Sequence, residues 1–325
     1  MHYLIKILLI TALLVLFIAC SSKSEYVQTS LQPKLNSNSN IMENQKTNMN
    51  VISKTSTPIS TRTIVNKVLP TPTVVPPTPT VVPIDTNIKL KNFLIKNLGP
   101  YDSKASKFGD IKFDPRFSSF VFSEFGRLDN RGQSAENYNA TFKFRAPSDT
   151  KLISPIKGVV SFVEWQSRAS DWEIHIKPTL ESDWILGIDH IASIDCEPSA
   201  LPTKVCDKQL TINGEILKIG MVVNENDVLG YVGSWSDYGN IGIYGLTELM
   251  VFKYLDDFQG VMNYCPTLYL AEEVQNELSA TIFELMKSYE QWTETDSIYD
   301  QTKMIAPGCI YKAIKEINGK IELID

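Results

Sequence analysis

The feature that most constrains this chain is a long stretch that cannot build a hydrophobic core. Residues 20–88 are rich in Ser, Thr, Asn and Pro, and PTPTVVP occurs twice in succession, at Pro70–Pro76 and Pro77–Pro83. Such a segment buries too little apolar surface to offset the entropy lost on ordering. Repeated Pro favours an extended, semi-rigid geometry. We therefore predict a disordered tether, which is either a spacer off a membrane or a linker of no required length.

The N-terminus predicts export. The apolar run from Ile7 to Ala19 spans 13 residues. A membrane-spanning helix needs roughly 20 residues, whereas the core of a signal peptide needs about 7–15. The small residue before Cys20, with apolar residues ahead of it, resembles a bacterial lipoprotein signal. We expect a signal peptide over 1–19 and a lipid on Cys20 that anchors an extracytoplasmic protein to the cell membrane; the alternative is an uncleaved anchor.

The remaining cysteines fit an exported protein. Apart from Cys20 there are four, namely Cys196, Cys206, Cys265 and Cys309. An even number in an exported chain favours disulfides over free thiols or a zinc knuckle. Three pairings are possible. We favour Cys196 with Cys206, which lie ten apart in a polar loop, and Cys265 with Cys309.

Charge and histidine content narrow the function. The formal net charge is -6 and the sequence has no long basic run, which argues against nucleic acid as a partner, because phosphate binding needs clustered Lys and Arg. The chain has only three histidines, His2, His175 and His190. This scarcity limits any metal-dependent or histidine-based chemistry.

The folded part changes character near residue 270. Over 89–270, short aromatic and β-branched segments, often alternating with polar residues, predict an antiparallel β domain. Over 271–325 we expect a helical extension. Apolar residues at steps of three and four predict a helix of about 20 residues that packs onto the β domain. These residues are Val274, Leu278, Ile282, Leu285, Tyr289 and Trp292.

Several pieces of the β domain, taken in order, are similar to a known family. They read FSEFGRL, NATFKFRAPSDTKLISPIKGVV, WILGIDHI, GEILKIGMVVNENDVLGYVGSW and GLTELMVF, between Ser118 and Phe252. This succession resembles the lysostaphin-like zinc endopeptidases of peptidase family M23. The resemblance implies an antiparallel β fold and an activity that cuts peptidoglycan peptides. Zinc serves that chemistry because it lowers the pKa of bound water and polarises the carbonyl.

The residues that the resemblance would place in the zinc site are mostly replaced. The family binds zinc with a His, an Asp four residues later, and the second His of a His-x-His pair. The first two positions fall here on Asn139 and Lys143. The pair falls on Thr247 and Leu249. A shift of one residue would place it on Leu246 and Glu248 instead.

One catalytic position of the family is kept: its lone strand histidine matches His190. His175 falls at a position that the family does not use. A rebuilt metal site could draw on His190, Glu248 and a further Asp. Asp189 adjoins His190, but neighbouring residues of a strand point to opposite faces, so we do not expect the two to hold one ion. The residues therefore predict no metal and no cofactor.

Taken together, the sequence favours a lipid-anchored cell-envelope protein with a mainly β, M23-like domain that no longer hydrolyses peptide bonds. We expect it to bind peptidoglycan or to regulate a wall hydrolase. The first alternative is an active M23-type zinc endopeptidase that uses a remodelled site. The second is a hybrid-barrel adaptor of an envelope complex, since the hairpin NENDVLGYVG also fits that fold.

Overall fold

The computed structural model describes residues 87–112, 120–129, 137–234, 244–255 and 259–325. The predicted signal peptide with Cys20 and the predicted tether up to residue 86 lie outside the described residues. The described residues all belong to one compact unit. Within them, no helix is both long enough and apolar enough to cross a membrane.

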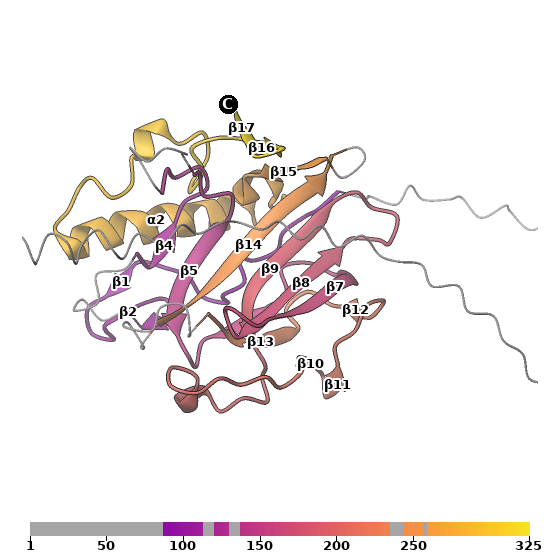
Figure 1. The fold of residues 1–325 in the computed structure, drawn as a ribbon. Helices are drawn as coiled ribbons and strands as arrows, with labels where there is room; N and C mark the ends of the chain where they lie inside the picture. The colour runs from indigo at the N-terminus through magenta and orange to yellow at the C-terminus, as the bar shows by residue number, and fades with distance from the viewer. Residues whose placement is uncertain (1–86, 113–119, 130–136, 235–243, 256–258) are drawn as a thin grey trace, which may run out of the picture. The chain divides into compact units, whose positions relative to one another are not determined.

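The unit is built mainly from short strands (Figure 1). In chain order they are β1 (Tyr101–Asp102), β2 (Lys107–Phe108), β3 (Ile111–Lys112), β4 (Phe122–Ser123), β5 (Phe142–Pro147), β6 (Lys151–Ile153), β7 (Gly158–Gln166), β8 (Asp171–Lys177), β9 (Ile185–Ala192), β10 (Thr211–Ile212), β11 (Glu215–Ile216), β12 (Val222–Val223), β13 (Val228–Val232), β14 (Tyr244–Tyr254), β15 (Gly260–Tyr264), β16 (Ala313–Ile317) and β17 (Lys320–Ile324). Three 3-10 turns, η1 (Pro198–Ala200), η3 (Pro266–Tyr269) and η4 (Gln301–Lys303), and one α-helix, α2 (Gln275–Thr293), complete the described elements.

Twelve of these strands form one sheet. Its main path runs β12-β7-β8-β9-β14-β15-β16-β17, with β4, β5, β6 and β13 attached off this path. The pairings between its strands are antiparallel. The predicted fold class, mainly antiparallel β with a helix near the C-terminus, is confirmed.

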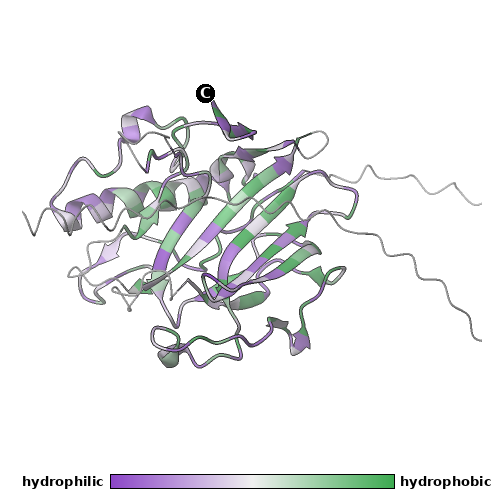
Figure 2. Ribbon diagram, in the orientation of Figure 1, coloured by the Kyte–Doolittle hydropathy of each residue, from purple (hydrophilic) through white to green (hydrophobic). Residues whose placement is uncertain are grey.

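Strands β5 and β14 show how the sequence sets the two faces of this sheet. Along β5, buried and half-buried residues alternate, because successive side chains of a strand point to opposite faces. Phe142 and Phe144 enter the core, where Phe122 packs on them at ring-centroid distances of 5.0 and 5.3 Å. Figure 2 shows hydrophilic and hydrophobic residues alternating along these strands. The polar residues of β5 and β14 are therefore free to build a site on the other face.

Helix α2 covers part of the core, as its apolar stripe predicts. Ile282, Leu285 and Tyr289 are buried. The Tyr289 ring lies 5.9 Å from that of Phe108, and Trp292 meets the same ring edge-on at 5.8 Å. The helix ends at Glu294 in a left-handed conformation, whose N–H is donated back to the last turn.

The C-terminal segment contains more than a helix. After α2 the chain returns to the sheet, where β16 pairs with β15 and β17 pairs with β16. The segment 271–325, expected to be a helical extension, therefore also supplies two strands to the main sheet. The sequence carried a sign that this expectation overlooked: Asn318-Gly319 joins two short alternating runs, Ala313–Ile317 and Lys320–Ile324, as in a two-residue β-hairpin.

Both predicted disulfides are confirmed. Cys196 and Cys206 lie 6.1 Å apart at Cα, and Cys265 and Cys309 lie 5.8 Å apart. The second bond joins the segment after β15 to the segment before β16, and so encloses α2 in a covalent loop. Since β15 and β16 also pair directly, this bond ties the helix to the sheet from both of its ends.

Candidate functional site

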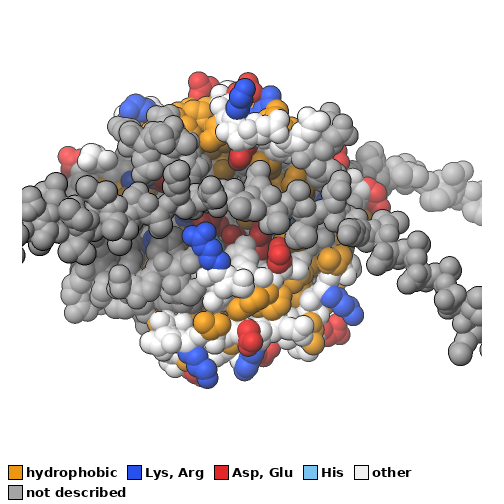
Figure 3. Space-filling view, viewed as in Figure 1, with side chains coloured by type: hydrophobic (Ala, Val, Ile, Leu, Met, Phe, Trp, Pro, Cys, Tyr) orange, Lys and Arg blue, Asp and Glu red, His pale blue; other side chains and the backbone are white. Residues whose placement is uncertain are grey.

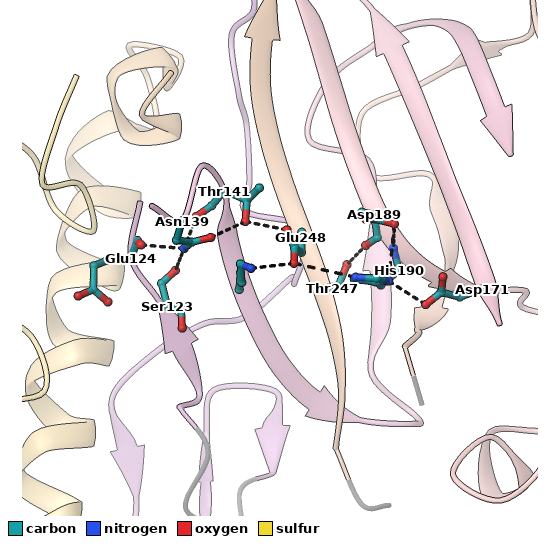
Figure 4. A network of polar contacts seen from close by, with 10 residues as sticks. Ser123, Glu124, Asn139, Thr141, Asp171, Asp189, His190, Thr247 and Glu248 are labelled. Atoms are coloured by element: carbon teal, nitrogen blue, oxygen red, sulfur yellow. Dashed lines mark hydrogen bonds and ion pairs between the residues drawn. The ribbon is translucent and has the colours of Figure 1, made fainter. Parts of the chain in front are cut away.

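Strands β5, β14 and β9 place three charged residues on one face of the sheet. Lys143 lies opposite Glu248, and Glu248 lies opposite Asp189. Residues directly opposite each other in a sheet point to the same face, so the three side chains meet. Lys143 Nζ lies 3.2 Å from Glu248 Oε1, with the two side chains 29% and 13% exposed. This ion pair stands at the centre of a polar network (Figure 4).

Asn139 forms one end of the network and is bound to the backbone. Its side-chain amide donates to the carbonyls of Glu124, at 2.8 Å, and of Thr141, at 2.9 Å. The Thr141 hydroxyl lies 3.1 Å from Asn139 Oδ1 and 2.9 Å from Glu248 Oε2, and its one proton serves one acceptor at a time. Because Asn139 is only 3% exposed, its role here is to satisfy buried carbonyls.

His190 forms the other end, where carboxylates surround it. Its Nδ1 lies 2.9 Å from Asp171 Oδ2, and its Nε2 lies 3.9 Å from Glu248 Oε1. Burial lowers the pKa of His190, but the hydrogen bond to Asp171 and the charges of Asp171, Asp189 and Glu248 outweigh it and raise that pKa to about 9. The ring is therefore a cation at neutral pH.

Asp189 is held close to His190 despite being its neighbour in the chain. Asp189 Oδ1 accepts the backbone N–H of His190 at 2.7 Å and lies 3.6 Å from its Nδ1. Burial raises the pKa of the Asp189 carboxyl to about 6; the positive charge of His190 opposes this rise, and the charges of Glu173 and Glu248 add to it. Asp189 is thus an acid in a locally negative environment.

The prediction that Asp189 and His190 point apart was wrong. Ligand-type atoms of Asp171, Asp189 and His190 all lie within 4.8 Å of one another. The reason lies in the backbone, since His190 has a φ of +63°, in the left-handed region that interrupts the regular alternation of a strand. Sequence periodicity cannot reveal such a residue.

The sequence left two placements for the His-x-His pair of the family, Thr247 with Leu249 or Leu246 with Glu248. The placement that contains Glu248 matches the network. Thr247 and Leu249 are both fully buried, and the Thr247 hydroxyl donates to the backbone carbonyl of Asp189 at 3.0 Å. Leu246 is also buried, at 3% exposure. The structure therefore places Glu248, and not Thr247 or Leu249, beside Lys143 and His190.

Asp171 is the site residue that sequence reasoning missed. It begins β8, is 1% exposed, and accepts through Oδ2 from both His190 Nδ1 and the backbone N–H of Ser234. The available signal was an acid at the start of the partly buried strand DWEIHIK. His175 lies on the same strand and is already engaged: its Nε2 lies 2.8 Å from Glu173 Oε1 and its ring stacks on Phe162.

These residues do not fit a zinc ion at the positions that the M23 resemblance indicates. Zinc is held by neutral imidazole, thiolate or carboxylate ligands. Lys143 instead offers an ammonium group, and that group already neutralises Glu248. The amide of Asn139 is used by backbone carbonyls. The chain therefore fills this part of the site with its own cation.

Comparison with known proteins gives only distant likenesses. No protein-family model and no curated protein matches the chain. Among solved structures, a variant of the catalytic domain of the prophage-encoded M23 protein EnpA from Enterococcus faecalis is similar over 43% of this chain and 86% of its own, with 17% identity and a TM-score of 0.24. Helicobacter pylori Csd3 is similar over 55% of this chain, with 16% identity and a TM-score of 0.27, and 43% of Csd3 is covered. Likenesses this distant carry no argument, so function must be judged from this chain's own residues.

Proposed function

We propose that this protein is a lipid-anchored, extracytoplasmic protein whose M23-like β domain binds peptidoglycan without hydrolysing it. Regulation of a wall hydrolase is the other non-hydrolytic role that we propose for such a domain. Three features support the proposal: the signal-like N-terminus with Cys20, the succession of M23-like motifs over Ser118–Phe252, and the replacement of the metal ligands.

The ion pair between Lys143 and Glu248 carries the non-hydrolytic part of this proposal. A catalytic zinc ion needs about three protein ligands and an open position for water. Here an ammonium group lies 3.2 Å from the carboxylate on the neighbouring strand. An ion at this place would have to displace that ammonium group or lie against it, and like charges at this distance repel.

The active-enzyme alternative depends on the other end of the network. Asp171, Asp189 and His190 offer two carboxylates and an imidazole close together. However, His190 Nδ1 is engaged with Asp171 Oδ2 at 2.9 Å. An ion on Nε2 could leave the bond from Nδ1 to Asp171 intact, but the ring would first have to lose a proton that its raised pKa retains. The ion would also meet Glu248, which already pairs with Lys143.

One experiment separates the two functions. We would purify the full-length protein in detergent, incubate it with zinc, remove excess metal and measure metal content, sedimentation with purified peptidoglycan, and release of soluble peptides. We expect co-sedimentation, less than one equivalent of zinc, and no release above buffer. Stoichiometric zinc together with peptide release that His190→Ala abolishes would overturn the proposal.

The anchor has its own test. Cys20→Ser removes the thiol that would carry the lipid. We expect this variant to leave the membrane fraction for the soluble extracytoplasmic fraction, while Cys206→Ser, which changes a cysteine of the β domain, stays with the membrane. Retention of the Cys20→Ser protein in the membrane would contradict lipidation at that residue.

A further inference from the structure

The main sheet ends at β17 with an open edge. Its path runs from β12 to β17, and within the described part of the chain β17 pairs only with β16. The hairpin of these two strands turns at Asn318 and Gly319, which both have positive φ, as a two-residue type I′ turn requires. Lys320, Ile321 and Glu322 are exposed. Because the edge of a sheet offers backbone groups to a further strand, β17 is a candidate interaction surface.

The hairpin shows which backbone groups of β17 face outward. The pair that closes a two-residue turn, here Ile317 with Lys320, exchanges hydrogen bonds. Ile324 also faces β16, because its carbonyl accepts the N–H of the residue before β16 at 2.7 Å. Hydrogen-bonded and open positions alternate along a strand, so the N–H and C=O groups of Ile321 and Leu323 point away from β16. Among the described residues, no partner meets these groups on that side.

The side chains of β17 carry one base and one acid on the same face. Lys320 and Glu322 lie two residues apart, so both point to that face of the sheet. There Glu322 Oε2 accepts from Lys315 Nζ at 2.9 Å, while 65% of the Glu322 side chain stays exposed. Figure 3 shows basic and acidic side chains close together at the top of the view, where Figure 1 places β16 and β17. Glu322 is thus accessible to a second cation on its outer side.

We propose that β17 pairs antiparallel with β17 of a second copy of this protein, about a twofold axis at Ile321. In this register the two Ile321 residues exchange their outward N–H and C=O groups. Lys320 then lies opposite Glu322 of the partner subunit, in a non-hydrogen-bonded pair, where side chains come closest. The twofold axis repeats this contact, so two pairs of opposite charge stabilise the dimer. The contact is self-complementary, as a symmetric interface requires.

Other registers and other occupants fit this edge less well. An axis at Glu322 would set two carboxylates opposite each other, and like charges in this position are destabilising. An axis at Leu323 would place Glu322 opposite Ile324, which carries no charge. The Pro-rich stretch 70–83 of the same chain is a poor partner strand, because Pro has no N–H to donate to a ladder. The charges of β17 therefore favour a second copy with the axis at Ile321.

The size of the contact sets its strength. Stable protein interfaces bury about 1,200–2,000 Å² in total, and β17 has only five residues. We therefore expect weak, reversible dimers in solution. Two copies that the proposed lipid anchors hold in one membrane would meet at a higher effective concentration. Only this gain rests on the proposed function, whereas the pairing itself does not.

The test uses the chain from residue 20 onward with Cys20→Ser, which takes no lipid and keeps the compact unit of the described residues whole. Sedimentation velocity of this parent chain at about 0.5 mM should show reversible dimers. Lys320→Glu and Glu322→Lys should each weaken dimerisation about tenfold or more, because two cross-strand pairs become repulsive. An equimolar mixture of the two variants should dimerise again, since every pair between them joins an acid and a base.

A second variant tests the backbone contact. Ile321→Pro removes an outward N–H and leaves the hydrogen bonds to β16 in place, since Pro is tolerated where the N–H of an edge strand faces solvent. It should abolish dimerisation while the midpoint of thermal unfolding stays close to that of the parent chain. Lys218→Glu, which changes an exposed lysine shortly before β12 at the other end of the sheet, is the matched control and should dimerise like the parent.

Three results would overturn the inference: a parent chain that stays monomeric, dimers that both charge variants leave unchanged, or a mixture of the two variants that does not dimerise. The inference and the proposed function can fail separately. A monomeric protein that still sediments with peptidoglycan would leave the proposed function standing. Dimers that do not bind peptidoglycan would leave the pairing of β17 standing.

Discussion

The two ends of the polar network handle their polar groups in opposite ways. At the β5 end, Asn139 is neutral and bonded to backbone carbonyls, and Lys143 is paired with a single carboxylate at 3.2 Å. At the β9 end, one imidazole lies among the carboxylates of Asp171, Asp189 and Glu248. The first end has become part of the scaffold. The second end keeps titratable groups close together.

This difference distinguishes two ways in which a catalytic site can lose its original residues. Replacing a ligand by an amide that holds the backbone removes chemistry and adds stability, because a satisfied buried amide strengthens the fold. Keeping a histidine among acids does the reverse, since desolvated charges are costly unless every one is paired. We therefore expect the β9 end to be more sensitive to substitution and to pH than the β5 end.

The largest expected effect is at Asp171. Asp171→Ala would leave the His190 cation and the Ser234 N–H without their buried partner. Breaking a buried ion pair from one side costs about 3–5 kcal/mol. Urea denaturation at pH 7 should show this loss in the free energy of unfolding, with Glu215→Gln, which changes an exposed acid on β11, as an unaffected control. A loss below about 1 kcal/mol would mean that Asp171 does not support the β9 end.

The next effect is a dependence of stability on pH. The pKa of His190 is raised from 6.5 to about 9, so the stability it contributes is complete below pH 6.5 and is lost as pH rises through 9. The pKa of Asp189 is raised from 3.8 to about 6, so the folded state binds this proton more tightly than the unfolded state does. The free energy of unfolding therefore falls as the pH rises from 3.8 through about 6.

Unfolding free energies measured from pH 4 to pH 9.5 should therefore fall in two steps, the upper one by a few kcal/mol. His190→Asn should remove the upper step and keep the lower one. An upper step that survives in this variant would show that another group causes it, and a flat profile in the wild type would contradict the charge arrangement at the β9 end.

The smallest expected effect is at Lys143. Lys143→Met removes an ion pair whose members are 29% and 13% exposed, and pairs that water still reaches contribute about 1 kcal/mol or less. Thermal unfolding should show a correspondingly small shift of the midpoint. A destabilisation as large as that of Asp171→Ala would erase the contrast between the two ends.

Local sequence patterns predicted the secondary-structure elements better than they predicted which elements pair with one another. The stripe from Val274 to Trp292 predicted α2, and the even cysteine count with its spacing predicted both disulfides. Periodicity and spacing are properties of neighbouring residues, so a sequence displays them directly. The hairpin of β16 and β17 does carry a local sign, Asn318-Gly319 between two alternating runs, which the prediction of a helical extension overlooked. The pairing of β16 with β15 joins distant segments and leaves no such sign.

The candidate site was predicted only in part, because its composition also depends on how distant strands pair. Motif order pointed to Asn139, Lys143 and His190, which do lie along one network of contacts through Thr141 and Glu248. It could not decide between Thr247 and Glu248, because a shift of one residue turns every side chain of a strand to the other face. It also missed Asp171, whose contact with His190 depends on how β8 and β9 pair.

The left-handed backbone at His190 makes this position hard to probe by substitution. With φ at +63°, any replacement changes two things at once: the ring and the ease of holding that torsion. Glycine would relax the backbone while deleting the charge, and valine or isoleucine would meet steric resistance that has nothing to do with imidazole. Asparagine is an uncharged side chain that tolerates the left-handed conformation. His190→Asn therefore removes the charge with little added backbone strain, and the effect of His190→Ala should be judged against it.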